Sequence, residues 1–321
     1  MAGTVTHHKF SNDVSKKLKN KILFNKDLFY LANQGHDLGM FYKWYNLKLR
    51  GETHKFALEV LQDKNFLEYI YNYVNYIKSN NLCNNSEVKN YLYGYIAHHY
   101  LDSFVHPYII NITGEVNKND KNTYKYAGLH CFYETQIDKT FLEQFYNSKD
   151  VHNIFPKHIY YSNKLLDTNK YAFLKTYNNE EYGTYFIDGL NDVYPFLKLF
   201  RNDPKKIKKI LYKSLDLALK SINNTSRYDF LSFALKSIDY KELYKEEVWN
   251  DPTNNELNYS SFMDLYNEAL VLVISVIEIL EDIITDPNKS VDLIYSKNIP
   301  NRSAIHGHEC NKDLKLKYFK Y

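Results

Sequence analysis

The sequence has little cysteine, glycine and proline. Its three cysteines, Cys83, Cys131 and Cys310, form neither a paired framework nor a CxxC motif, so the fold does not depend on disulfides. The 321 residues include 10 glycines and 7 prolines, and no proline precedes Pro107. Since both residue types interrupt helices, their scarcity favours long helices over a turn-rich β protein.

The sequence also lacks an excess of one charge and a long apolar run. Its 41 basic and 38 acidic residues leave a net charge of +3, which argues against nucleic acid as a partner. The longest apolar run, Ala269 to Ile277, is interrupted by Ser275 and is shorter than the roughly 20 residues that cross a bilayer. We therefore predict no transmembrane segment. The polar N-terminus has no apolar signal-peptide core, which predicts a cytoplasmic protein.

The chain is instead rich in helical patterns. Hydrophobic residues make up 44% of it, which is enough for a large core and argues against disorder. One helix is predicted to begin at Ser86 and to end at His106, because the residue before Pro107 is biased away from helical angles. Ser261 and Asp264 resemble a capping box at the start of a second helix.

Other segments complete this picture. Residues 111–122 are polar and are predicted to form a loop, whereas residues 124–145, residues 228–238 and the segment after Asp203-Pro204 are predicted to be helical. The basic run Lys205 to Lys209 is interpreted as the solvated face of a helix. We predict an all-α, multi-helix protein with one domain over residues 1–321. Residues 1–140 are expected to carry the site, and residues 150–321 to complete the helical structure.

Ionisable residues recur at helical spacing in the segment GYIAHHYLDSFVHPY. His98, Asp102 and His106 stand at i, i+4 and i+8, which places them on one stripe of a helix whose other residues are mostly apolar. A row of ionisable groups inside an apolar helix is costly to bury unless its charge is compensated. A bound dication would compensate it.

The segment GLHCFYETQIDKTF repeats the pattern. His130, Glu134 and Asp138 again stand at i, i+4 and i+8. Imidazole nitrogen and carboxylate oxygen are usual zinc ligands, and this spacing puts two donors on the same side of one helical turn. Two such patterns on consecutive predicted helices indicate a metal centre more strongly than one. The alternative is two sets of core histidines paired with carboxylates.

Three upstream positions are candidates for further ligands: His7 or His8, Asp37 and His54. Taken singly, each also has an ordinary structural interpretation. His7 would be a surface residue near the chain end, Asp37 a helix cap and His54 a residue at a helix start.

Together these motifs resemble those of the zinc-dependent phospholipase C family of bacteria. In chain order they are Thr6-His7, Gly35-His36-Asp37, His54, His98-x3-Asp102 with His106-Pro107, and His130-x3-Glu134. The resemblance implies an all-helical fold of the phospholipase C and P1 nuclease type, which agrees with the fold class predicted above. It also implies a zinc-dependent hydrolase of phosphodiester bonds, with phospholipid at a membrane surface as one candidate substrate.

The resemblance further implies a cluster of up to three zinc ions and assigns its ligands. One ion would be bound by Asp37, His54, His98 and Asp102, and a second by His106, His130 and Glu134. A third would be shared by Asp102 and His7. Adjacent zinc ions would neutralise the phosphate oxygens and lower the pKa of water, with Asp37 as the candidate general base. Asp138, His99 and His36 would orient the ligands.

Two other functions stay open. The related single-strand nucleases share the helical zinc fold, and aromatic residues beside the metals would favour that activity. A zinc-binding structural protein without turnover would have a closed ligand set. The His36-Asp37 pair is also similar to HD-type phosphohydrolases, but these would leave His54, His130 and Glu134 unexplained. The segment HGHEC, residues 306–310, is a weaker metal candidate and is interpreted as an irregular tail.

Overall fold

The computed structural model confirms the predicted all-α class. It describes residues 3–61, 65–116, 120–126, 128–146, 148, 150–203, 205–220, 232–233, 235–296, 299–310 and 314–320. The α-helices are α1 (Thr4–Leu18), α2 (Lys26–Ala32), α3 (Leu38–Phe41), α4 (Leu47–Leu61), α5 (Phe66–Ser79), α6 (Ser86–Thr113), α7 (Leu129–Phe145), α8 (Asn163–Tyr177), α9 (Glu180–Phe196), α10 (Ile207–Lys220), α11 (Phe262–Thr285) and α12 (Leu293–Ser296).

Short elements connect these helices. They are the 3₁₀ helices η1 (Gly35–Asp37), η2 (Lys121–Tyr126), η3 (Val151–Ile154) and η6 (Tyr240–Tyr244), and the π-helical turn η4 (Leu197–Arg201). The strands described are β1 (Trp249–Asn250) and β2 (Leu257–Asn258), which form one antiparallel hairpin with Trp249 opposite Asn258.

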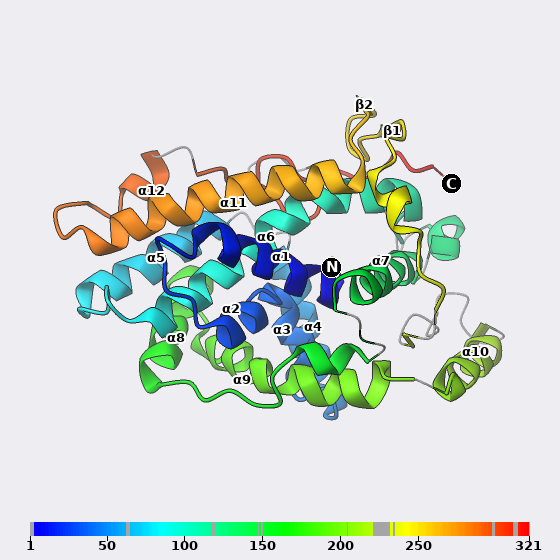
Figure 1. Ribbon diagram of the computed structural model, residues 1–321, viewed down its shortest axis with the longest axis horizontal. Helices are drawn as coiled ribbons and strands as arrows, with labels where there is room; N and C mark the ends of the chain where they lie inside the picture. Colours follow the sequence, from blue (N-terminus) through cyan, green and yellow to red (C-terminus); the bar gives the residue numbers. More distant parts are fainter. Residues whose placement is uncertain are drawn as a thin grey trace.

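Helix α6 runs through the middle of the molecule (Figure 1). It packs against α1 and α2 on the N-terminal side, and against α7, α8 and α11 from later in the chain. Every side chain from Asn90 to Ser103 is buried. The stripe of α6 that carries the predicted ligands therefore lies inside the helical assembly.

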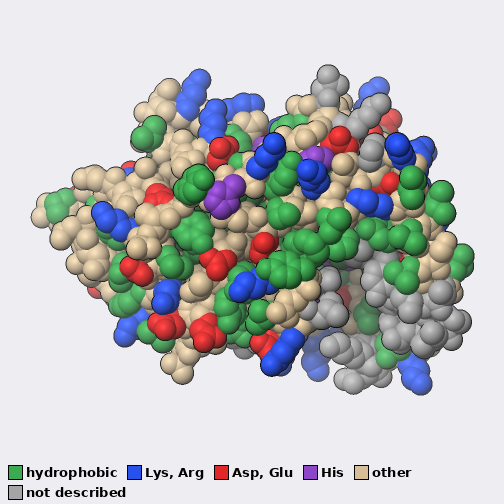
Figure 2. Space-filling view, turned by 90° about the horizontal axis from the view of Figure 1, so that it is seen from below, with side chains coloured by type: hydrophobic (Ala, Val, Ile, Leu, Met, Phe, Trp, Pro, Cys, Tyr) green, Lys and Arg blue, Asp and Glu red, His purple; other side chains and the backbone are tan. Residues whose placement is uncertain are grey.

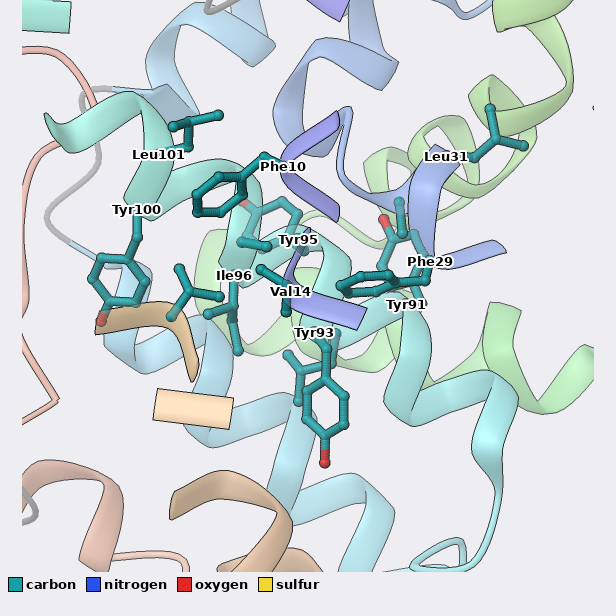
Figure 3. Close-up of a cluster of buried hydrophobic side chains, with 14 of the residues drawn as sticks. Phe10, Val14, Phe29, Leu31, Tyr91, Tyr93, Tyr95, Ile96, Tyr100 and Leu101 are labelled. Atoms are coloured by element: carbon teal, nitrogen blue, oxygen red, sulfur yellow. The ribbon is translucent and has the colours of Figure 1, made fainter. Parts of the chain in front are cut away.

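Tyrosines form much of the core around α6 (Figure 3). Tyr69, Tyr73 and Tyr100 are fully buried, and each hydroxyl has a hydrogen-bond acceptor. Tyr69 donates to Asn169 Oδ1 at 2.7 Å, and Tyr73 donates to the Val88 carbonyl at 3.0 Å. A buried tyrosine ring adds apolar contact area without cost only when its hydroxyl is paired, as here. This explains how the core accommodates these three tyrosines.

The predicted end of α6 at His106 is wrong. Pro107 lies inside the helix, which continues to Thr113 and so includes the first residues of the predicted 111–122 loop. A proline in a helix leaves the carbonyl four residues earlier without its usual N–H donor. Here that carbonyl belongs to Ser103, and Arg302 Nη2 donates to it at 3.5 Å. A residue from the far end of the chain thus supplies the missing donor.

Other helix predictions are confirmed or shifted. The Ser261–Asp264 capping box is present at the start of α11, with Asp264 N donating to Ser261 Oγ at 3.1 Å. The helix predicted over 124–145 begins only at Leu129, since Gly128 adopts a left-handed conformation after η2. Part of the predicted 228–238 helix, residues 228–231 and 234, lies outside the described residues, and its described part, 232–233 and 235–238, is not helical.

The surface carries mixed charge, as the near-neutral balance predicts. Figure 2 shows basic and acidic side chains interspersed with hydrophobic ones over one face. Within the described ranges, none of the helices has both the length and the apolar character needed to cross a membrane, α11 included. The prediction of a single domain over residues 1–321 stays a prediction.

Candidate metal centre

The site begins on α6, where the predicted stripe is fully inside the protein. His98, Asp102 and His106 are all buried, and the Asp102 carboxylate lies between the two imidazoles. Asp102 Oδ2 is 3.2 Å from His98 Nε2, and Asp102 Oδ1 is 3.4 Å from His106 Nε2. The i, i+4, i+8 spacing therefore produces the shared face that the sequence predicts.

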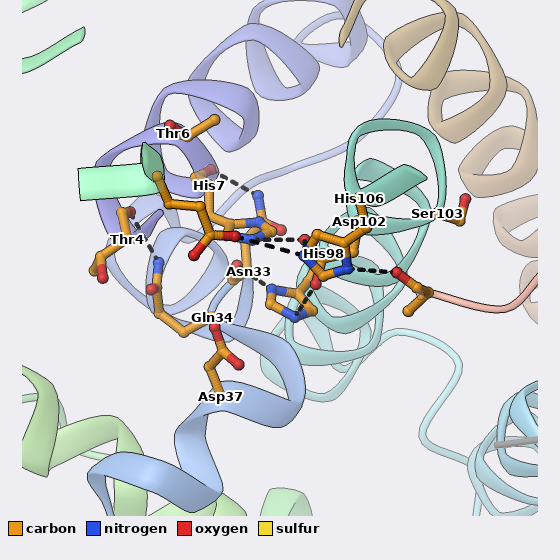
Figure 4. Close-up of polar contacts among 12 residues, drawn as sticks. Thr4, Thr6, His7, Asn33, Gln34, Asp37, His98, Asp102, Ser103 and His106 are labelled. Atoms are coloured by element: carbon orange, nitrogen blue, oxygen red, sulfur yellow. Dashed lines mark hydrogen bonds and ion pairs between the residues drawn. The ribbon is translucent and has the colours of Figure 1, made fainter. Parts of the chain in front are cut away.

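Helix α1 adds His7 to this stripe (Figure 4). The His7 ring is completely buried and stacks on the His98 ring, with centroids 4.1 Å apart. His7 Nε2 lies 3.2 Å from Asp102 Oδ1. Asp102 thus faces three imidazoles, from His7, His98 and His106, which is the arrangement expected of a carboxylate that bridges cations.

The turn η1 contributes a second carboxylate and a further imidazole. Asp37 and His36 are buried, with His36 Nε2 3.3 Å from Asp37 Oδ1. His98 Nε2 lies 3.1 Å from His36 Nδ1. Gly35 has a φ of +51°, and a Cβ on it would lie 2.2 Å from the His98 ring. Only glycine therefore lets η1 approach α6 closely enough to bring His36 and Asp37 to His98.

Helix α7 holds the other predicted pair. His130 Nε2 lies 2.8 Å from Glu134 Oε1, which in turn is 3.7 Å from His106 Nε2. The His106 and His130 rings are 5.2 Å apart. The predicted grouping of His106, His130 and Glu134 across two helices is therefore present as a cluster.

Among the described residues, three groups bring ligand atoms within 4.8 Å of one another. They are His7–His98–Asp102, His36–Asp37–His98 and His106–His130–Glu134. Seven of the eight predicted ligands belong to these groups. The eighth, His54, has an exposed side chain on α4 and belongs to none of them. His36, which the sequence suggests only as an orienting residue, stands among the ligand atoms instead.

Asp138 and His99, which are expected to orient the ligands, lie outside the three ligand groups. Asp138 Oδ1 accepts hydrogen bonds from Thr6 N at 2.8 Å and from Thr6 Oγ1 at 2.9 Å, so it anchors the first turn of α1, which carries His7. His99 turns away from the cluster. Its ring stacks on Phe66, with centroids 3.5 Å apart, and its Nε2 lies 2.7 Å from the Arg302 carbonyl.

A backbone group from the C-terminal part also touches the centre. His106 Nδ1 lies 2.6 Å from the Ala304 carbonyl, to which it can only donate, so its Nε2 is the atom free to face the carboxylates. Segment 300–304 is fixed along α6 by Tyr100, whose hydroxyl donates to the Pro300 carbonyl at 2.7 Å. No sequence motif reveals this contact, because its acceptor is a backbone carbonyl.

Burial sets the charges in the centre. It lowers the pKa of His7 to about 4 and the pKa of His36 well below its usual value, so both imidazoles are neutral at pH 7. Burial also raises the pKa of Asp37 to about 8. Burial raises the pKa of Asp102 as well, but the imidazoles of His106 and His98 lower it more, so that it lies well below its usual range. Neutral imidazoles are the form that binds metal.

Several ligand atoms are not satisfied by hydrogen bonds within the cluster, and a divalent cation would satisfy them. Asp37 Oδ1, His7 Nδ1 and His106 Nε2 are buried atoms that make no hydrogen bond. Buried polar atoms without a hydrogen bond are rare in proteins, and several in one cluster call for a bound species. Imidazole nitrogens and carboxylate oxygens from four elements make up the donor set of zinc.

Comparison with known proteins agrees with this chemistry. The family described as zinc dependent phospholipase C matches residues 6–192. The chain belongs to this family. No curated protein matches the chain, and no solved structure does. The range matched by the zinc-dependent phospholipase C family contains all three ligand groups, whereas α10, α11 and segment 300–304 lie beyond it.

The contact between Ala304 and His106 can be tested through Gly307. This glycine has a φ of +71°, and a Cβ on it would lie 2.5 Å from the Ser103 carbonyl. Gly307→Ala is therefore expected to push the segment away from α6 and to weaken the hydrogen bond that orients His106. Loss of such an orienting contact lowers metal affinity by about tenfold or more. Zinc titration against a competing chelator measures the change.

Gly51→Ala is the matched control, since nothing lies within 4 Å of a Cβ at Gly51. Its zinc affinity should equal that of the unaltered protein. Equal affinity in Gly307→Ala as well would show that the segment does not position His106.

Proposed function

We propose that the protein hydrolyses phosphodiester bonds with zinc, and that its substrates are phospholipids. The observation that supports this most directly is the convergence of three ligand groups around Asp102, all within the range matched by the zinc-dependent phospholipase C family. Bound zinc would supply Lewis acidity toward the phosphate oxygens and a lowered pKa for water.

The ligands divide between the groups as follows. His98 Nδ1 lies 3.1 Å from the Asn33 carbonyl, to which it donates, so only its Nε2 is available to a metal. His98 therefore serves either the group with His7 and Asp102 or the group with His36 and Asp37. The group of His106, His130 and Glu134 is separate from both. Two or three ions, as the family resemblance implies, are compatible with this division.

Asp37 is the residue we assign to proton transfer. Its Oδ1 makes no hydrogen bond, so this atom is free to accept a proton from the attacking water. Burial raises the pKa of Asp37 to about 8, so without a cation this carboxyl is largely protonated at pH 7. The rise also means that Asp37 needs a nearby positive charge to be ionised at pH 7.

Removal and return of zinc tests the proposal. Protein purified without added metal is expected to contain about two or three zinc ions per chain and to hydrolyse a phosphocholine ester. Chelation should abolish hydrolysis, and added zinc should restore it. Elemental analysis and product release measure the two effects.

The same experiment separates the alternatives. Cleavage of single-stranded DNA in place of the phosphocholine ester would indicate a nuclease. Stoichiometric zinc with neither substrate cleaved would indicate a structural zinc protein. Absence of bound zinc, with none taken up on titration, would contradict the proposal altogether.

A further inference from the structure

Helix α10 turns an apolar side toward solvent. Four of its side chains are largely exposed: Ile207 at 63%, Ile210 at 66%, Leu211 at 62% and Leu217 at 73%. Their spacing of three, four and seven residues places them on one side of the helix. In Figure 1 the helix lies at the edge of the molecule, beyond the end of η4.

The opposite side of α10 is polar and faces the protein. Asp216 is buried, and the Tyr212 hydroxyl donates to the Phe200 carbonyl at 3.1 Å. These two residues are four apart and therefore share a side of the helix. Surface helices of globular proteins usually have the reverse orientation, with the apolar side inward. The outward apolar side is therefore suited to an apolar phase outside the protein.

The charged residues on α10 and just before it are mostly basic. Lys205 and Lys206 precede the helix and Lys213 lies within it, all with exposed side chains. Lys208 donates to the Leu199 carbonyl. The one acidic residue between Ile207 and Lys220 is the inward-facing Asp216. An apolar stripe flanked by lysines is the composition of helices that lie in the interface of an anionic membrane, with the lysine amines among the headgroups.

The helix is also linked to the metal centre. Arg201, at the end of η4, lies six residues before Ile207, and its Nη1 is 3.8 Å from Asp138 Oδ2. Asp138 anchors the first turn of α1, which carries His7. Tyr212 and Lys208 tie α10 back to η4 through the Phe200 and Leu199 carbonyls. A membrane bound to α10 would therefore be connected through η4 and Asp138 to the helix that carries His7.

We propose that α10 is an interfacial helix that docks the protein on an anionic phospholipid bilayer by inserting its apolar side. This goes beyond the proposed function, because docking requires neither zinc nor turnover. Affinity of such helices comes from apolar burial together with attraction between lysines and anionic lipid, so it should fall as salt rises.

The test is co-sedimentation with vesicles of phosphatidylglycerol and phosphatidylcholine in equal amounts, with chelator present so that no lipid is hydrolysed. The double variant Ile210→Gln/Leu211→Gln is expected to bind at least about tenfold more weakly, since two inserted side chains become polar. Glutamine is a good helix former, so α10 itself should be retained. Lys205→Gln/Lys213→Gln should lose binding to anionic vesicles and much of its salt dependence.

Val271→Gln is the matched control, because Val271 is 70% exposed and lies on a different helix, α11. It should bind vesicles as the unaltered protein does. The double variant should also keep its helical circular-dichroism signal and its zinc content. Hydrolysis of a soluble short-chain phosphodiester should be unchanged, which separates docking from catalysis.

Two outcomes would overturn the proposal. One is equal vesicle binding by the unaltered protein and the Ile210→Gln/Leu211→Gln variant. The other is a self-associating protein that binds no vesicles and becomes monomeric in that variant, which would make α10 an interface between copies of this chain. Vesicle binding that depends on α10 in a protein without hydrolytic activity would support docking while the proposed function failed.

Discussion

Asp102→Asn is expected to abolish hydrolysis and to remove at least one zinc ion, with the helical fold largely retained. Asp102 Oδ1 lies 3.2 Å from His7 Nε2 and 3.4 Å from His106 Nε2, and its Oδ2 lies 3.2 Å from His98 Nε2. Asparagine keeps the shape of the side chain but removes the negative charge that cations at this position need. Elemental analysis, hydrolysis and circular dichroism measure the three effects.

His99→Gln is the control for the register of α6. His99 is next to His98 in sequence, but it stacks on Phe66 and contacts the Arg302 carbonyl instead of the ligand groups. Its replacement should therefore leave the zinc content nearly unchanged, with some loss of stability. Depletion of zinc by His99→Gln but not by Asp102→Asn would show that the wrong side of α6 has been assigned to the metal.

The helices were predictable where their signals are local. The Ser261–Asp264 capping box lies within four residues, so the start of α11 follows from the sequence alone. The end of α6 was not predictable in this way. Helix α6 passes Pro107 because Arg302 donates to the Ser103 carbonyl, and that donor lies 199 residues away in the chain. A rule that considers only the residues beside a proline cannot include it.

The metal centre was likewise predictable where its signals are local and not where they depend on contacts between distant parts of the chain. The pairs His98–Asp102 and His130–Glu134 each belong to one helix, so their spacing is enough to bring their side chains together. Grouping residues from different elements depends on tertiary packing. Gly35 lets η1 bring His36 against His98, whereas α4 leaves His54 exposed. The sequence motifs identify both histidines, but only the packing distinguishes between them.

The basic run at Lys205 shows a further limit. Its lysines predict a solvated helix face. Lys205 and Lys206 are exposed but precede α10, whereas Lys208 and Lys209 lie within it and are half-buried. The sequence pattern gives the two sides of α10 but not which of them faces the protein. That orientation is decided by hydrogen bonds to η4, such as the one from Tyr212 to the Phe200 carbonyl.

Gly94→Ala is expected to destabilise the protein by about 2 kcal/mol, as overpacking of a close contact typically does. Gly94 lies on α6 where it crosses α2, and a Cβ there would lie 2.5 Å from Ala32 Cβ and 2.8 Å from the Phe29 carbonyl oxygen. Helix α2 would have to move. The residue after α2, Asn33, accepts from His98 and donates through Nδ2 to the His7 carbonyl at 2.8 Å. Zinc affinity should therefore fall together with stability.

Urea unfolding with and without zinc separates these two effects, because a ligand that binds the folded state adds to its stability in proportion to the logarithm of its affinity. Gly94→Ala should be less stable without zinc, and zinc should stabilise it less than it stabilises the unaltered protein. Gly51→Ala, again in a helix but in open space, should be neutral or more stable by up to about 1 kcal/mol. If Gly94→Ala behaved like Gly51→Ala, α2 and α6 would not be as close as described, and α2 would not hold His98 and His7 in place.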